Sequence, residues 1–227
     1  MSRPWRLTTA IGLFLLAVVG IVFVVIALVS EPETVDYTTN HQPGQAVNVT
    51  LQTVGSFGSG DHPTWVSYLV ENPGGGWVHT TLFTVPANTR VNMTILNYDS
   101  GSPLRNQQLG QVTGTYGRLA LLNGHPFRVI DSNNPNGNGV AHTFSIPTLG
   151  ISVPLYGNNG NANLCSAAPC TLSSPHKIIR FSFTSPSTAG SYPWQCFVPC
   201  GLGFLYGNGG PMQTLGYMDG FMKVAST

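Results

Sequence analysis

The fold of this chain is decided by a short apolar stretch, Val140-Ala141-His142-Thr143-Phe144-Ser145-Ile146. Its β-branched and aromatic residues are typical of a strand. A loop rich in Asn and Gly precedes the stretch, and Pro147 follows it directly, as is usual at strand ends. The stretch therefore predicts a strand that carries one imidazole, that of His142.

Similar runs rich in Val, Thr, Tyr, Phe and Ile occur along the rest of the chain, separated by clusters of Gly, Pro and Asn. No stretch beyond the N-terminus has a helical apolar period of useful length. Short strands with turns between them predict an all-β, antiparallel sandwich, here as one domain over residues 46–227. The expected strands are 46–54, 65–70, 78–85, 90–96, 127–130, 140–146, 177–184, 190–197 and 220–224.

The N-terminus carries an uncharged apolar run from Ala10 to Val29, which is long enough to cross a bilayer as one helix. Two arginines precede the run and three acidic residues follow it closely, so the positive-inside rule places the N-terminus in the cytoplasm. A cleaved signal peptide is the alternative, but its apolar core would be only ~7–15 residues long. We expect a single-pass plasma-membrane protein, with residues 1–30 as cytoplasmic N-terminus and anchor, 31–45 as a tether, and an extracytoplasmic domain.

Charged residues make up only 7% of the 227 residues, with nine basic and eight acidic side chains, against roughly 25% in soluble domains. This balance excludes nucleic acid as a partner. It is typical of a membrane-associated or partner-covered protein. It also suits an acidic exterior, where a fold that depends on few carboxylates loses little stability as pH falls, and we therefore hypothesise an acidophile.

The four cysteines form two pairs that are close in sequence. Cys165 and Cys170 bracket four residues, and Cys196 and Cys200 bracket three. Disulfides are expected for both pairs in an oxidising compartment. For the second pair another interpretation stays open, because two thiolates at this spacing after a strand can also bridge a pair of coppers.

His142, Cys196 and Met218 follow one another in the order of a blue-copper site. Such a site needs an imidazole, a thiolate, a weak axial thioether and one more imidazole. No histidine occurs after His176, so the second imidazole is missing from the expected place.

Two segments resemble subunit II of heme-copper terminal oxidases. Residues 141–151, with His142 before an aromatic and a Pro-Thr-Leu-Gly turn, are similar to its first copper-ligand segment, and residues 196–201 are similar to its cysteine loop. The resemblance covers roughly residues 78–224 and implies a cupredoxin-like Greek-key β-sandwich with one N-terminal transmembrane helix. It also implies that the chain docks on a catalytic subunit that holds heme.

The sequence departs from the patterns of this family at the ligands. Phe204 and Gly207 occupy the positions of the histidine and methionine of the copper-A pattern, and Val198 that of its acidic residue. In the mononuclear, sulfocyanin-like pattern, Gln213 stands where a histidine should be. We also expect the Gly-rich segment 201–212 to serve as a docking surface.

These departures lead to two functional hypotheses. The first is a non-catalytic, subunit II-like component of a membrane heme-copper oxidase, with Cys196 and Cys200 bridged, no cofactor in this chain, and quinol as electron donor to the complex. The alternative is a membrane-anchored, sulfocyanin-like blue-copper electron carrier, with His142, Cys196 and Met218 as ligands and an unidentified fourth. Together with Cys200, these three residues are the candidate metal ligands of the chain. The sequence leaves open whether the sequon residues Asn48 and Asn92 are glycosylated.

Overall fold

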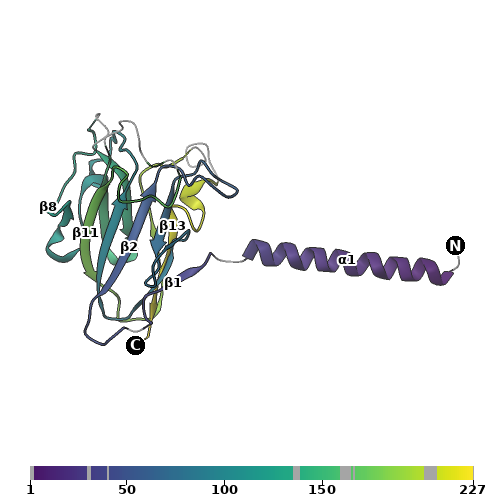
Figure 1. The fold of residues 1–227 in the computed structure, drawn as a ribbon. Helices are drawn as coiled ribbons and strands as arrows, with labels where there is room; N and C mark the ends of the chain where they lie inside the picture. The colour runs from purple at the N-terminus through teal and green to yellow at the C-terminus, as the bar shows by residue number, and fades with distance from the viewer. Residues whose placement is uncertain are drawn as a thin grey trace. The chain divides into compact units, whose positions relative to one another are not determined.

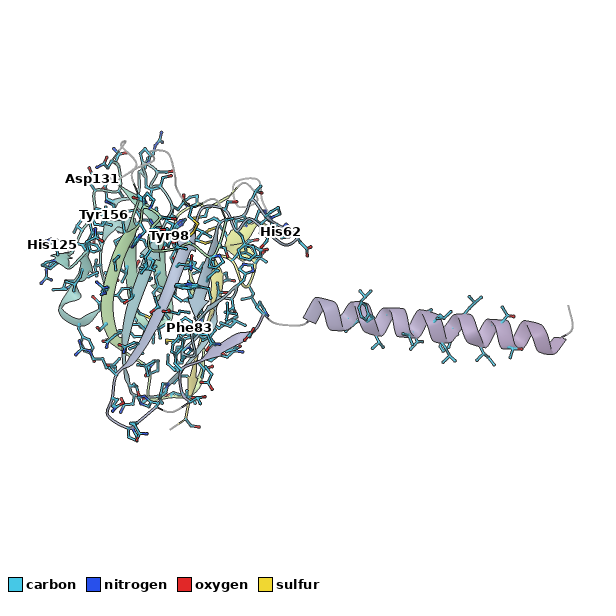
Figure 2. All side chains as sticks on the ribbon, in the orientation of Figure 1. His62, Phe83, Tyr98, His125, Asp131 and Tyr156 are labelled. Atoms are coloured by element: carbon cyan, nitrogen blue, oxygen red, sulfur yellow. A yellow bond between two sulfur atoms is a disulfide. The ribbon has the colours of Figure 1, made fainter. Side chains whose placement is uncertain are left out.

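The computed structural model describes residues 3–29, 32–39, 41–134, 139–158, 165, 167–201 and 209–226. Two compact units make up the chain, Met1–Glu31 and Pro32–Thr227. The first unit is a single helix, α1 (Arg3–Val29), and the side chains of residues 8–25 project outward around it (Figure 2). Its segment Thr8–Val25 has a mean hydropathy of 2.7 and is long and apolar enough to cross a membrane. The membrane itself and the orientation of the helix stay predictions.

The second unit is a sandwich of two β-sheets (Figure 1). The first sheet has the strand order β1-β5-β13-β12-β9-β10, and the second has the order β4-β3-β2-β6-β11-β7-β8. The first sheet contains β1 (Thr34–Asp36), β5 (Leu82–Pro86), β9 (Val140–Ile146), β10 (Ile151–Tyr156), β12 (Gly190–Gln195) and β13 (Asp219–Ala225). The second contains β2 (Val47–Val54), β3 (Ser67–Glu71), β4 (Trp77–Val78), β6 (Arg90–Asn97), β7 (Ala120–Leu122), β8 (His125–Phe127) and β11 (Lys177–Thr184). Short 3-10 turns are η1 (Gln107–Gly110), η2 (Tyr116–Arg118), η3 (Pro147–Leu149) and η4 (Pro211–Gln213).

The predicted all-β sandwich is confirmed, and most predicted strands occur within a few residues of the expected bounds. The sheets are mixed rather than purely antiparallel, because β5 pairs in parallel with β1 and β13, and β2 pairs in parallel with β6. The strand expected over 78–85 is divided into β4 and β5, since the buried Thr80 turns the chain and its hydroxyl accepts a hydrogen bond from the Leu82 N–H at 3.0 Å.

The expected tether over residues 31–45 is corrected in part. Residues Thr34–Asp36 form β1, which pairs with β5 at the edge of the first sheet. Val35 is 2% exposed and Tyr37 9% exposed, so both contribute apolar area to the core. Burial of these side chains favours a strand over a solvated linker.

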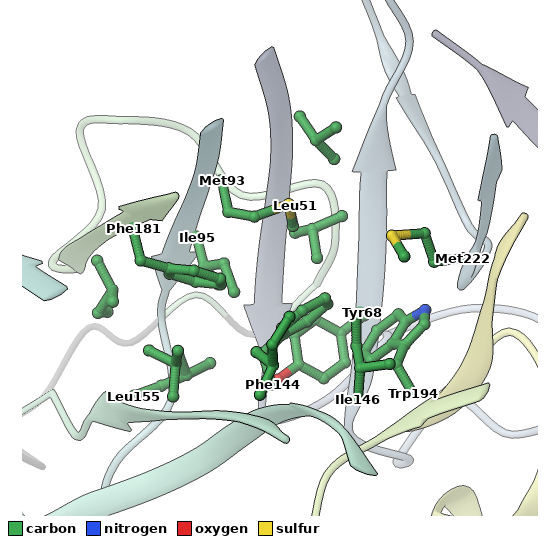
Figure 3. Packing of buried hydrophobic residues seen from close by; sticks show 14 of the residues in the cluster. Leu51, Tyr68, Met93, Ile95, Phe144, Ile146, Leu155, Phe181, Trp194 and Met222 are labelled. Atoms are coloured by element: carbon green, nitrogen blue, oxygen red, sulfur yellow. The ribbon is translucent and has the colours of Figure 1, made fainter. Parts of the chain in front are cut away.

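The core between the sheets is centred on Trp194, Phe144 and Tyr68 (Figure 3). The Trp194 ring lies 4.9 Å from that of Phe144 and 5.0 Å from that of Tyr68, measured between centroids. Both polar tips are satisfied: the Trp194 indole N–H donates to the Thr81 carbonyl, and the Tyr68 hydroxyl donates to the Thr143 carbonyl. Buried aromatic side chains with such partners fix one packing arrangement, and here they hold β9 and β12 side by side.

Three chain segments meet at one end of this pair of strands. β12 ends at Gln195, which pairs with Ser145 of β9, so Cys196 follows directly beside the strand that carries His142. β13 begins at Asp219, and the preceding Met218 accepts a hydrogen bond from the Cys196 N–H through its carbonyl oxygen at 3.0 Å. The fold therefore brings the predicted ligand segments together.

Candidate metal centre

His142, Cys196 and Cys200 form a compact cluster with their ligand atoms within 4.8 Å of one another. The Nδ1 atom of His142 lies 3.2 Å from the Cys200 sulfur and 3.9 Å from the Cys196 sulfur, and the two sulfurs are 3.6 Å apart. All three residues are buried. It is the one such cluster of His, Cys, Asp or Glu side chains among the described residues.

Thr143 fixes the cysteine loop against the histidine strand. Its backbone N–H donates to the Cys196 sulfur at 3.4 Å, and its hydroxyl oxygen accepts from the Phe197 N–H at 2.8 Å. Thr143 is fully buried, so these bonds are shielded from water and hold the loop in a defined position.

Asp99 lies directly behind His142. Its Oδ2 atom accepts a hydrogen bond from His142 Nε2 at 3.1 Å, and its Oδ1 atom accepts from the Ser100 N–H. Because Nε2 donates to Asp99, the opposite nitrogen, Nδ1, faces the sulfurs. Metal-binding histidines are commonly oriented by a carboxylate in this way.

The backbone of Asp99 is held by Asn97, a fully buried residue at the end of β6. The Asn97 side-chain oxygen accepts from the Asp99 N–H, while its amide nitrogen donates to the carbonyls of Asp99 and Tyr156. Gly55 leaves room for the carboxylate, because a Cβ at that position would lie 2.7 Å from Asp99 Oδ1. Sequence reasoning missed the role of Asp99, since the contact joins two different sheets over 43 residues of chain and has no spacing signature.

Asp99 and the three residues of the cluster shift one another's pKa values. Burial alone would lower the pKa of His142, but its hydrogen bonds to Asp99 and Cys196 raise it to about 9. Burial would raise the pKa of Cys196, yet hydrogen bonds from Cys200 and His142 hold it well below the ordinary thiol value. The hydrogen bond that Cys200 donates to Cys196, together with burial, raises the pKa of Cys200 well above that value. Burial also acts to raise the pKa of Asp99, but its bond to His142 leaves it lowered.

The expected Cys196–Cys200 disulfide is wrong in this structure. Both cysteines are free, with their sulfurs at non-bonded distance. The Cys196 sulfur is instead directed at the Thr143 N–H and the imidazole of His142. The other predicted disulfide, Cys165–Cys170, is present.

Met218 is fully buried in the same core cluster as both cysteines, and its backbone N–H donates to the Pro211 carbonyl. Gln213, which stands where the sulfocyanin-like pattern has a histidine, is exposed, and its side-chain oxygen accepts from the Gly209 N–H. The side-chain oxygen of Gln213 is therefore engaged by the backbone at the surface and does not act as the missing ligand. Phe204 and Gly207, and most of the segment expected to serve as a docking surface, lie outside the described residues.

The donor set fits a soft transition metal. Two thiolates and one imidazole are ligands that suit copper and zinc. The Val198 carbonyl oxygen lies 3.6 Å from the Cys196 sulfur, so a fourth donor atom stands close to the cluster. The geometry matches the predicted ligands His142, Cys196 and Cys200, and metal binding by them stays a prediction.

No protein-family model matches the chain, and no curated protein matches it. Among solved structures the chain is similar to reduced rusticyanin, with 18% identity over 85% of this chain and 84% of that chain and a TM-score of 0.33. It is also similar to a methionine-to-leucine variant of rusticyanin, with 18% identity over 87% and 84% and a TM-score of 0.32. Rusticyanin is a cupredoxin. At these identities and TM-scores the likeness says nothing about the site, which rests on its own geometry.

Proposed function

We propose that this chain is a membrane-anchored copper protein that carries electrons, with copper held by His142, Cys196 and Cys200. The observation that supports it is the buried cluster in which Nδ1 of one histidine faces two unbridged sulfurs while Nε2 is bonded to Asp99. A copper ion supplies one-electron redox chemistry at such a site. A site with soft ligands, all of them buried, suits electron transfer, because its donors are shielded from solvent.

The residues of the chain prepare the cluster for a cation. Asp99 holds His142 in one ring orientation, so that the lone pair of Nδ1 can face the metal. Thr143 positions the Cys196 sulfur through its N–H, and the sheet pairing of β9 and β12 keeps His142 and Cys196 in register. Burial excludes water from the sulfurs, which would otherwise be exposed to oxidation.

The oxidase-subunit hypothesis stays a prediction, and its copper-free form is less well supported. That form was based on the missing second histidine and on a bridged Cys196–Cys200 pair, and the bridge is not present because both thiols are free. Co-purification of the chain with a heme protein from detergent extract would support a role as oxidase subunit. Isolation of the copper-loaded chain by itself would support the free carrier.

The test is a copper titration of the full chain in detergent micelles, followed by visible absorption and metal analysis. We expect an intense thiolate-to-copper band that saturates at a defined copper-to-protein ratio. A ratio of one indicates a mononuclear site, and a ratio of two indicates a bridged pair. Absence of the band, with both thiols still titratable, would refute the proposal, and uptake of zinc alone would assign the site a structural role.

A further inference from the structure

A basic groove lies on the outer face of the second sheet, with a volume of about 470 Å³. Its lining comes mainly from β2, β6, β11 and η2, and includes the polar and aromatic residues Asn48, Arg90, Asn92, Tyr116, Arg180 and Ser182 beside apolar ones such as Leu119 and Leu121. No Asp or Glu lines it. Two of the other surface pockets of the domain are lined by Glu71, so this groove differs from them in the sign of its charge.

The strand pattern explains why these side chains face outward. Along β6 and β11 the apolar residues alternate with polar ones, and the apolar set is buried in the core. In the antiparallel register Asn92 pairs with Ser182, Arg90 pairs with Thr184, and Arg180 pairs with Thr94. The two arginines therefore flank the central Asn92–Ser182 pair. Along β6, Arg90 and the residue opposite Arg180 are four residues apart, which corresponds to about 14 Å between their backbone positions.

Within the described part of the chain, neither arginine forms an ion pair with a carboxylate. Both are exposed, and the one salt bridge recorded among the described residues joins His142 to Asp99. Arg90 is held in place, because its Nε donates to Asn92 Oδ1 at 3.2 Å and its guanidinium lies 5.0 Å from the centroid of the Tyr116 ring. Guanidinium groups without an ion-pair partner favour carboxylates and sulfates, which they bind through two hydrogen bonds.

The floor between the arginines is an ordered polar network. Asn92 Nδ2 donates to Asn48 Oδ1 at 3.0 Å, and the Ser182 hydroxyl donates to Asn92 Oδ1 at 2.9 Å. These bonds orient Asn48 so that its exposed amide nitrogen remains available to a ligand. The groove thus has an ordered floor of amide and hydroxyl groups along its length, with an arginine from each end.

We propose that this groove binds an acidic oligosaccharide, with its carboxylate or sulfate groups on Arg90 and Arg180 and its hydroxyl groups on Asn48, Asn92 and Ser182. The two arginines come from opposite ends of the groove, and the hydroxyl and amide floor between them matches a chain of sugar hydroxyls. The site is separate from the metal centre, because its polar side chains lie on the outer face of the second sheet, whereas the buried His142 belongs to the first sheet.

The test uses the full chain in neutral detergent, without copper, from a host that adds no N-linked glycans to the sequon residues Asn48 and Asn92. Calorimetry measures binding of an oligogalacturonate and of a neutral maltooligosaccharide of equal length. We expect the acidic sugar to bind and the neutral one not to bind. The double variant Arg90→Gln/Arg180→Gln should lose about tenfold or more in affinity, as expected for charge-assisted hydrogen bonds.

A matched control is Arg105→Gln/Arg128→Gln, which removes the same charge from two exposed arginines outside the groove. Its affinity should stay within about twofold of the parent, because screened charges at a distance contribute little. The single variant Arg180→Gln tests the site without disturbing the Arg90–Tyr116 contact, and a thermal melt checks that it is folded.

Equal losses in the two double variants would overturn the proposal, as would failure of the oligogalacturonate to bind. Stronger binding of polyglutamate would assign the groove to an acidic protein segment instead. Stronger binding of phosphatidylglycerol vesicles than of phosphatidylcholine vesicles, lost in Arg90→Gln/Arg180→Gln, would assign it to a lipid headgroup. None of these outcomes depends on copper, so the metal proposal stands or falls separately.

Discussion

The two cysteine pairs of this domain have similar spacing and opposite fates. Cys165 and Cys170 form a disulfide in a loop beside a small satellite cluster. Cys196 and Cys200 are buried, unbridged and in contact with His142. The spacing of cysteines in sequence therefore does not decide their chemistry. The difference lies in the neighbours, because an imidazole fixed by a carboxylate and the Thr143 N–H both stabilise a thiolate at the second pair.

Removing one thiolate of the second pair should have the largest effect, because it removes a metal ligand. We expect Cys196→Ser to abolish the thiolate-to-copper band and to lower copper affinity more than about 100-fold, beyond the 10–100-fold typical of losing an outer partner. The matched control is Cys165→Ser/Cys170→Ser, which should keep the band and the copper stoichiometry. Copper binding that survives in Cys196→Ser, measured by titration, would place the metal elsewhere.

The variant Cys165→Ser/Cys170→Ser also measures how much the disulfide of the first pair stabilises the domain. Loss of the Cys165–Cys170 bridge frees a short loop in the unfolded chain, so we expect the free energy of unfolding to fall by about 2 kcal/mol. Denaturant unfolding of the metal-free protein measures this change. Cys200→Ser should not reproduce it, and a similar loss in both variants would mean that the two pairs do not differ in kind.

Asp99 tests whether the neighbours define the second pair. Asp99→Asn leaves an amide where the carboxylate accepts the His142 N–H, and copper affinity should fall about 10–100-fold while the protein stays folded. Asp131→Asn, at an exposed loop position, is the control and should be without effect. Gly55→Ala should shift affinity in the same direction and by less, because its new methyl displaces the Asp99 carboxylate. Unchanged affinity in Asp99→Asn would remove Asp99 from the site.

Proton release distinguishes the two pairs further, since a disulfide does not titrate. His142, with its pKa raised to about 9, and Cys200, with its pKa raised by the bond to Cys196 and by burial, both carry protons at neutral pH. Copper must displace them, so its affinity should rise with pH up to about 9. Calorimetry in buffers of different ionisation enthalpy counts the protons. Zero proton release at pH 7 would contradict the protonation of the cluster.

A fall in pH should have the smallest effect of all these changes, because it leaves the fold intact. Asp99 has a lowered pKa, so its stabilising contribution is present above the ordinary carboxylate value of 3.8 and is lost only as pH falls through the lowered one. Burial raises the pKa of Asp219, so protonation of Asp219 favours the folded state and offsets part of that loss. We expect the circular dichroism of the chain to be the same at pH 7 and pH 4.5. Unfolding in that interval would end the acidophile hypothesis.

Much of the architecture could be predicted, because strands and the apolar helix are encoded by local composition. The strand around His142 has the predicted bounds. The remaining features depend on tertiary contacts. β1 is a strand because Val35 and Tyr37 reach the core, and Asp99 meets His142 only when the two sheets pack together. The bridging of cysteines depends on such contacts too, and the sequence-based prediction failed there for the second pair.

The central claim is that the buried pair binds copper together with His142. X-ray absorption at the copper edge of the copper-loaded full chain tests it most directly, because the technique identifies the atoms bonded to the metal. The account predicts a first shell with two sulfur ligands and at least one imidazole nitrogen, and loss of one sulfur in Cys200→Ser. A shell of oxygen and nitrogen alone would contradict it.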